Sequence, residues 1–188
     1  MPDRPAGPLT RQQLLVAFER LSEILAGRGL KADIYVVGGA AMVLAFDARP
    51  ATRDVDAVFK RRNEVFKAAA QVSREQGLPD GWLNDSAARF LGRPDRRSAP
   101  ALDLPGLRVM AASPEYLLAM KILADRHDRD RDDIRLLVRR LGISTLAQVE
   151  AIYAEVYPFE GIAPDTRLRL EEILAEIPPP VADNPPDG

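Results

Sequence analysis

The sequence contains no cysteine, which excludes disulfides, zinc–thiolate sites and thiol nucleophiles. It has no apolar run near the roughly 18 residues that a membrane-spanning helix needs, and its N-terminus lacks the hydrophobic stretch of a signal peptide. The one histidine, His127, lies in a charged segment, where a surface position is the simplest interpretation. We therefore expect a cytoplasmic protein.

A strong charge of one sign is missing as well. Lys and Arg number 26 and Asp and Glu 28, so the net charge of −2 gives no global attraction to nucleic acid. Contact with RNA would need a local basic patch, and the best candidate is one arginine cluster: Arg89, Arg93, Arg96 and Arg97. Such a cluster is compatible with phosphate binding and equally with a solvated loop.

What the chain does have is enough apolar residues for a core. With 46% hydrophobic residues in 188, it is compatible with one α/β domain and a smaller helical lobe. We expect a disordered lead over 1–9, a core over 10–112, a helical lobe over 113–177 and a disordered tail over 178–188.

Hydrophobic periodicity predicts alternating helices and strands in the core, and helices alone in the lobe. The expected core helices are 10–26, 39–46 and 63–76, and the expected strands are 34–37, 55–59, 102–104 and 107–111. The expected lobe helices are 114–126, 131–141, 146–157 and 166–177. Turn-forming residues between 77 and 100 predict mostly a loop.

A glycine pair followed by an aspartate pair is the most informative motif. Gly38 and Gly39 follow an apolar strand and open a small-residue helix, where free backbone N–H groups favour phosphate. Asp54 and Asp56 lie two residues apart on the next strand, so their side chains point the same way, with backbones roughly 6.6 Å apart. Two carboxylates of this kind suit Mg²⁺, which binds a few carboxylates together with substrate phosphates.

Each half of the motif also has a simpler interpretation. Paired glycines are more often a tight strand-to-helix turn, and two aspartates can lie solvated on an exposed strand. Their combination favours metal-dependent phosphoryl chemistry.

A second group of charged residues follows in the expected helical lobe. Lys121 is flanked by leucines and alanines one helical turn away, so it needs an anionic partner, unless its amine extends to the surface. Asp130 and Asp133 are three residues apart and share a helical face if the helix begins early enough. Asp133 lies at the edge of the apolar stripe of that helix.

The order of these motifs resembles the minimal nucleotidyltransferases of the polymerase-β superfamily, and most closely the branch of AbiEii-like and mycobacterial MenT-like toxins. The resemblance spans about residues 10–175. It rests on Val37-Gly38-Gly39-Ala40, Thr52-x-Asp54-x-Asp56, Leu78-Pro79-x-Gly81-Trp82-Leu83-Asn84, Lys121 and Arg129-Asp130-x-x-Asp133-Ile134.

The resemblance implies an α/β (α+β) nucleotidyltransferase fold, in which helices flank a mixed sheet and a helical lobe follows. It implies transfer of a nucleotide from an NTP to an acceptor hydroxyl, with Mg²⁺ as cofactor. In the toxin branch the acceptor is in some members the 3′ end of tRNA, and a separate antitoxin protein neutralises the enzyme.

The resemblance also implies roles for single residues. Asp54 and Asp56 would hold the NTP–Mg²⁺ complex, and Thr52 would line the site. Lys121 would contact phosphates, and Asp133 would correspond to the distal acidic residue of the toxins.

Other residues are weaker candidates. Arg49 flanks the expected site and could hold triphosphate, Asn84 could reach the nucleotide or pin its loop to the core, and Asp130 could assist Asp133. A third carboxylate is expected on a later strand between apolar neighbours. Asp103 has that local pattern, although Pro105 and Gly106 follow directly.

Two alternatives stay open on these residues. One is transfer to a small molecule, as in aminoglycoside nucleotidyltransferases. The other is a degenerate domain that binds a nucleotide or a partner protein without turnover, because the third carboxylate is not clearly present.

Overall fold

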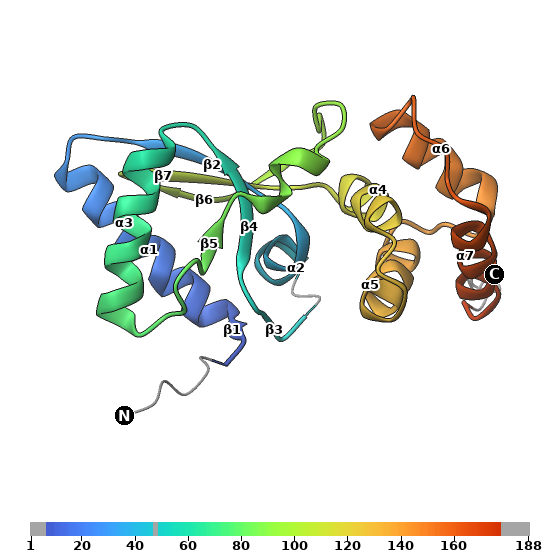
Figure 1. Cartoon of the computed structure of the whole chain (residues 1–188), viewed down its shortest axis with the longest axis horizontal. Coiled ribbons are helices and arrows are strands. Elements are labelled where there is room, and N and C mark those ends of the chain that lie inside the picture. The colour runs from blue at the N-terminus through green and yellow to red at the C-terminus, as the bar shows by residue number, and fades with distance from the viewer. Residues whose placement is uncertain (1–6, 47–48, 178–188) are drawn as a thin grey trace, which may run out of the picture. The chain divides into compact units, whose positions relative to one another are not determined.

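The computed structural model describes residues 7–46 and 49–177 and divides into two compact units (Figure 1). The N-terminal unit extends to Ser113, and the C-terminal unit begins at Pro114. The expected tail, 178–188, and most of the expected lead lie outside the described residues. Leu9, which we expected in that lead, is instead buried in a short strand.

The N-terminal unit is built on a mixed sheet with the strand order β5-β4-β2-β7-β6. Its strands are β2 (Ala32–Val36), β4 (Val55–Phe59), β5 (Leu83–Asn84), β6 (Ala99–Leu104) and β7 (Leu107–Ala111). β2 and β7 are parallel, as are β4 and β5, whereas β2–β4 and β6–β7 are antiparallel. A separate antiparallel pair joins β1 (Leu9–Thr10) to β3 (Ala51–Thr52). The expected mixed α/β fold is therefore confirmed.

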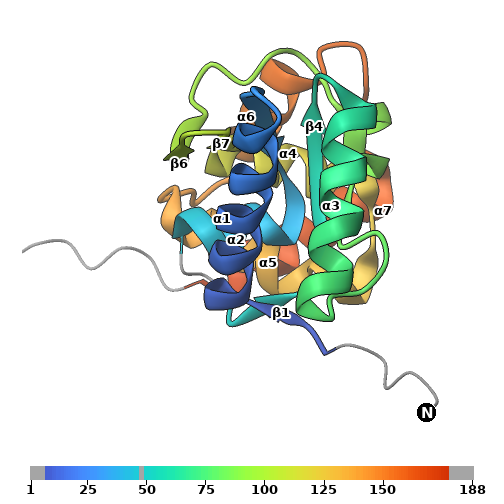
Figure 2. The same ribbon diagram turned by 90° about the vertical axis from the view of Figure 1, so that its left-hand side faces the viewer.

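Helices cover one face of this sheet. Figure 2 shows α1 (Arg11–Gly27) and α3 (Arg62–Gln76) side by side in front of the strands. The strand residues on the buried face are Ile34, Val36, Val55, Ala57, Phe59 and Val109. Their neighbours along the strands are only half-buried, and these include Tyr35, Val58 and Met110. This alternation is typical of a sheet with one covered and one open face.

Local signals explain where the first helix begins. Thr10 accepts a hydrogen bond from the backbone N–H of Gln13, and the Gln13 side chain accepts one from the backbone N–H of Thr10. This capping box satisfies two N–H groups that the helix itself leaves without partners. At the far end of the sheet, Gly106 packs so tightly on α1 that a Cβ would lie 2.1 Å from the carbonyl oxygen of Ser22.

The segment 77–100 is more ordered than we expected. It contains β5 and a 3₁₀ helix, η1 (Ser86–Phe90), where we expected mostly a loop. The backbone N–H of Val55 donates to the carbonyl of Trp82 at 2.6 Å, and the indole N–H of Trp82 donates to the carbonyl of Ala69 at 3.0 Å. These partners are distant in sequence, so local turn signals could not predict them.

The C-terminal unit is helical, as expected. Its helices within the described residues are α4 (Pro114–Ala124), α5 (His127–Arg140), α6 (Leu146–Val156) and α7 (Pro164–Ala175). α4 ends two residues earlier than expected because Asp125 adopts a left-handed conformation with φ 46°. α5 begins four residues earlier than expected, which places Asp130 and Asp133 one turn apart on the same helix. In the described part of the chain, no helix combines the length and apolar character that crossing a membrane requires.

Candidate functional site

The glycine turn and the aspartate strand lie against each other in the N-terminal unit. The backbone N–H of Val37, which follows β2, donates to the carbonyl of Asp56 at 2.9 Å. Gly38 then opens α2 (Gly38–Phe46) with φ 61°, a conformation that favours glycine. A Cβ on Gly38 would lie 3.4 Å from Oδ2 of Asp56, so this carboxylate packs directly against the glycine backbone.

Gly39 brings two further predicted residues to the same place. A Cβ at this position would lie 2.7 Å from Oγ1 of Thr52 and 3.2 Å from Nη1 of Arg49. The hydroxyl and the guanidinium therefore lie against the first turn of α2. Thr52 is buried there, with 7% of its surface exposed. The structure thus brings together Gly38, Gly39, Thr52, Arg49 and Asp56.

Asp54 joins this group from the bend between β3 and β4. The Thr52 hydroxyl donates to the backbone carbonyl of Asp54 at 3.0 Å, which fixes the course of the bend. Nδ2 of Asn84 donates to Oδ2 of Asp54 at 3.3 Å. Asn84 also lies opposite Asp56 in the parallel pairing of β4 and β5. Both aspartates are half-buried, so they are within reach of solvent.

The group offers complementary features to a phosphate and a cation. The first N–H groups of α2 have no acceptor within the helix, and they carry the positive end of its dipole. Asp56 lies beside them, and a bound phosphate would be repelled by that carboxylate unless a cation lay between the two. The arrangement therefore favours a phosphate and a cation bound together.

The residues fit Mg²⁺ in one particular way. Among the described residues there is no group of three or more His, Cys, Asp or Glu side chains that could hold a metal ion. Mg²⁺, however, is commonly bound by only one or two carboxylates, with waters and substrate phosphates completing its octahedron. Asp54 and Asp56 therefore suit a cation that arrives with phosphates better than one held by protein alone.

Asp103 lies away from this pair. It is exposed on the edge strand β6, where Nζ of Lys31 lies 2.7 Å from its Oδ1 and the hydrogen bond from Lys31 lowers the pKa of Asp103. Its position in the sheet is level with Arg108 and Asp33, whereas Asp56 is level with Val37. Four residues along β2 separate these two levels, about 13 Å. The structure therefore does not bring Asp103 to the aspartate pair as a third carboxylate.

The second predicted group forms a buried ion cluster in the C-terminal unit. Nζ of Lys121 lies 2.8 Å from Oδ1 of Asp130 and 2.6 Å from Oδ2 of Asp133. The exposed fractions are 8% for Lys121, 6% for Asp130 and 3% for Asp133. The anionic partner that Lys121 needs is thus supplied by both aspartates. The catalytic roles of Lys121 and Asp133 remain predictions.

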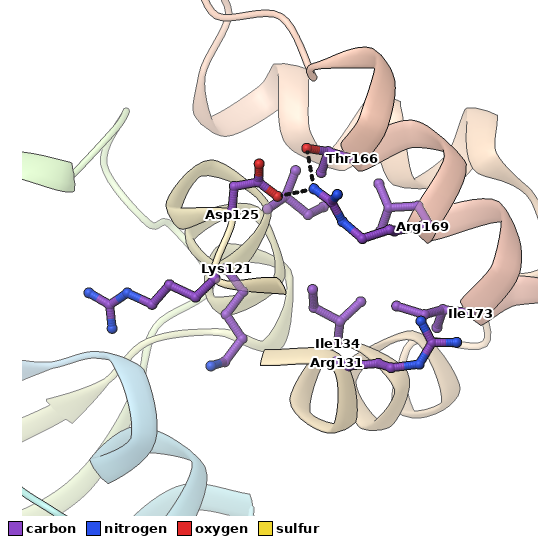
Figure 3. Close-up of a pocket in the computed structure, with 10 residues that line it drawn as sticks. Lys121, Asp125, Arg131, Ile134, Thr166, Arg169 and Ile173 are labelled. Atoms are coloured by element: carbon purple, nitrogen blue, oxygen red, sulfur yellow. Dashed lines mark hydrogen bonds and ion pairs between the residues drawn. The ribbon is translucent and has the colours of Figure 1, made fainter. Parts of the chain in front are cut away.

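A small pocket lies beside Lys121, where α4, α5 and α7 meet (Figure 3). Arg169 crosses it and donates to Asp125 and, at 3.1 Å, to the hydroxyl of Thr166. Ile134, Ile173 and Arg131 line it as well. Its volume of about 20 Å³ has room for roughly one water molecule, so the pocket cannot hold a nucleotide.

The structure also shows a residue whose role we did not predict, Asp95. Its carboxylate accepts hydrogen bonds from the Tyr35 hydroxyl at 2.9 Å, from the backbone N–H of Ser113 at 2.8 Å and from that of Arg97 at 3.0 Å. These bonds fix the arginine loop to the ends of β2 and β7. The sequence signal was only a turn-forming aspartate before two arginines.

One comparison with known protein families gives a match over most of the chain. A family model described as "Nucleotidyltransferase of unknown function (DUF6036)" matches residues 12–169. No curated protein matches the chain. Among solved structures, the chain is similar to an antigenic nucleotidyltransferase-like protein from Paracoccidioides brasiliensis, with 17% identity and a TM-score of 0.43 over 90% of this chain and 95% of that one.

Proposed function

We propose that this chain, which belongs to the nucleotidyltransferase family whose model matches it, transfers a nucleotide from an NTP to an acceptor hydroxyl with the help of Mg²⁺. The observation that carries the proposal is the placement of Asp56 against the glycine-opened start of α2, with Asp54 joined to the same group through Thr52 and Asn84. In a nucleoside triphosphate bound with its cation, the phosphates suit the N–H groups of α2 and the cation suits the aspartates.

Each residue of the group has a part in holding the substrate. Gly38 and Gly39 carry no side chain of their own, so Asp56, Thr52 and Arg49 pack directly against the first turn of α2, whose backbone N–H groups favour a phosphate. Asp54 and Asp56 would hold Mg²⁺, which neutralises phosphate charge and aligns the groups for in-line attack. Arg49, whose guanidinium lies against the same turn, suits the remaining phosphate oxygens through its fork of donors.

The reaction balances with these groups alone. The acceptor oxygen forms a bond to the α-phosphorus, the bond from that phosphorus to the β-phosphate oxygen breaks, and pyrophosphate leaves. The acceptor proton passes to a solvent water. Lys121 as a phosphate contact and Asp133 as a distal acid are roles that we also propose from the resemblance.

For the biological role we propose a toxin that acts on tRNA 3′ ends and is neutralised by a separate antitoxin. The resemblance to the AbiEii-like and MenT-like branch supports it. The arginine cluster is compatible with contact to RNA phosphates, because the Asp95 carboxylate ties its segment to Ser113, just after β7. Growth arrest on expression, abolished by Asp54→Asn, would separate a toxin from an enzyme that modifies a small molecule.

A direct test uses purified protein with each labelled NTP, Mg²⁺ and total tRNA. We expect label in RNA with the natural protein and none with Asp54→Asn/Asp56→Asn. The matched control is Asp103→Asn. It removes an exposed carboxylate on the edge strand β6, away from the aspartate pair, and the variant should transfer label normally. If the folded natural protein labels neither RNA nor protein, nucleotidyl transfer is contradicted.

A second candidate function is nucleotide binding without turnover. It is favoured by the lack of a three-carboxylate group in the described structure. Calorimetry that shows tight NTP binding, together with no label transfer, would support it, and measured turnover would eliminate it.

A further inference from the structure

Asn84 is an uncharged residue beside the aspartate pair. It lies in the parallel pairing of β4 and β5 directly opposite Asp56, so the two side chains are on the same face of the sheet. Its Nδ2 also reaches Asp54, at 3.3 Å from Oδ2. One side chain therefore borders both carboxylates.

The orientation of the Asn84 amide is fixed by its other hydrogen bond. The backbone N–H of Ser86 donates to Oδ1 of Asn84 at 3.0 Å. A backbone N–H can only donate, so the atom that faces it must be the amide oxygen and the atom that faces Asp54 must be the NH₂ group. Asn84 thus presents an N–H donor to Asp54. Its amide oxygen faces the Ser86 backbone and does not serve as a ligand for a cation at Asp54.

The Asn84 side chain stands on a rigid base. Trp82, two residues earlier, is 1% exposed, and its indole N–H is bonded to the carbonyl of Ala69 in α3. The Trp82 carbonyl accepts the backbone N–H of Val55, the first residue of β4. Asp54 itself lies in the bend outside the strand pairing, so its carboxylate depends on Asn84 for orientation.

From these contacts we infer that Asn84 is a positioning residue that ties one oxygen of Asp54 and leaves the other for a cation. The inference rests on the proposed function, because it assumes that a cation binds there with phosphates. A neutral amide also adds no third carboxylate to the two aspartates, so the cation is held firmly only when phosphates supply further oxygens. The amide therefore makes cation binding depend on the nucleotide.

The test measures binding and needs no turnover. Mn²⁺ would be titrated, by electron paramagnetic resonance, into the natural protein alone and with each α,β-methylene NTP analogue. We expect binding only with an analogue present. Asn84→Ala should weaken that binding about 10- to 100-fold, the usual cost of removing a residue that orients a metal ligand.

Asn84→Asp is the matched variant, because it keeps the shape and the acceptor for Ser86 while replacing the donor to Asp54 with a carboxylate. In EDTA we expect its melting temperature to lie below that of the natural protein, because three carboxylates repel one another. Mn²⁺ without nucleotide should raise the melting temperature of this variant again, whereas it should not change that of the natural protein. A purely structural role would lower the melting temperature without recovery by Mn²⁺.

The outcomes separate the two proposals. If the natural protein binds no Mn²⁺ with any analogue, the proposed function fails and this inference fails with it. If the natural protein binds but Asn84→Ala binds equally well, or Asn84→Asp does not respond to Mn²⁺ alone, only the role of Asn84 is overturned.

Discussion

Each unit of the molecule holds a pair of aspartates, and the two pairs have opposite surroundings. Asp54 and Asp56 are half-buried, and the neutral amide of Asn84 borders both. Asp130 and Asp133 are buried, and Lys121 bridges them. The Asp54 carboxylate accepts a hydrogen bond from a neutral donor and is within reach of solvent, which suits a cation from solution. A pair that already shares a lysine has half of its negative charge balanced by that lysine.

Removing the first pair should give the largest effect on activity. We expect Asp54→Asn/Asp56→Asn to lower nucleotidyl transfer by at least about 10³-fold, because metal stabilisation of a transition state is worth several kcal/mol. The melting temperature should stay the same or rise slightly, since repulsion between the two carboxylates is removed. A large fall in melting temperature would mean that this pair is structural.

Removing the lysine of the second pair should act on stability. Lys121→Met leaves Asp130 and Asp133 buried without their cation, which should cost about 3–5 kcal/mol of unfolding free energy. Urea denaturation followed by circular dichroism measures this loss. The triple variant Lys121→Met/Asp130→Asn/Asp133→Asn should recover most of it, because no buried charge remains. Equal instability of both variants would contradict the ion cluster as the cause.

A smaller effect is expected from the backbone that presents the first pair. Gly39→Ala should cost about 1–3 kcal/mol, because its Cβ would lie 2.7 Å from the Thr52 hydroxyl. NTP binding should weaken as Thr52 is displaced. Gly27→Ala is the control, since nothing lies within 4 Å of its Cβ position, and it should not lower the melting temperature.

The smallest effect belongs to an ion pair in open water, which serves as a reference for both aspartate pairs. The hydrogen bond from Arg20 lowers the pKa of Glu75 from 4.5 to about 2. Since the folded-state pKa is depressed, the stabilisation is present above pH 4.5 and is lost as the pH falls through about 2. Arg20→Ala should return the pKa toward 4.5, which NMR titration of the Glu75 carboxyl carbon would show. A pKa that stays near 2 would assign the shift to another group.

The sequence predicted those parts of the fold that depend on neighbours along the chain. The first helix begins where the Thr10 cap predicts, and the strand Val55–Phe59 has the expected bounds. β5 was not predicted, because it has only two residues. It is held in place by hydrogen bonds of the preceding Trp82 to α3 and β4, which are distant in sequence.

The geometry around the aspartate pair was predicted in part, and the roles of its residues stay predictions. The sequence spacing suggested that the aspartates and the two glycines would meet, and the structure places Asp56 against Gly38 and joins Asp54 to Thr52. It could not tell that Asp103 lies at another level of the sheet, because alternation along a strand gives the face of a side chain and says nothing about its position along the neighbouring strands.

Trp82 is the only tryptophan of the chain, and it is buried in the N-terminal unit two residues before Asn84. The protein therefore contains an intrinsic fluorophore that belongs to one unit alone. Its emission during denaturation reports the loss of the sheet and of α3, whereas circular dichroism reports the helices of both units. Two optical signals from the unlabelled protein are thus enough to tell which unit a substitution has weakened.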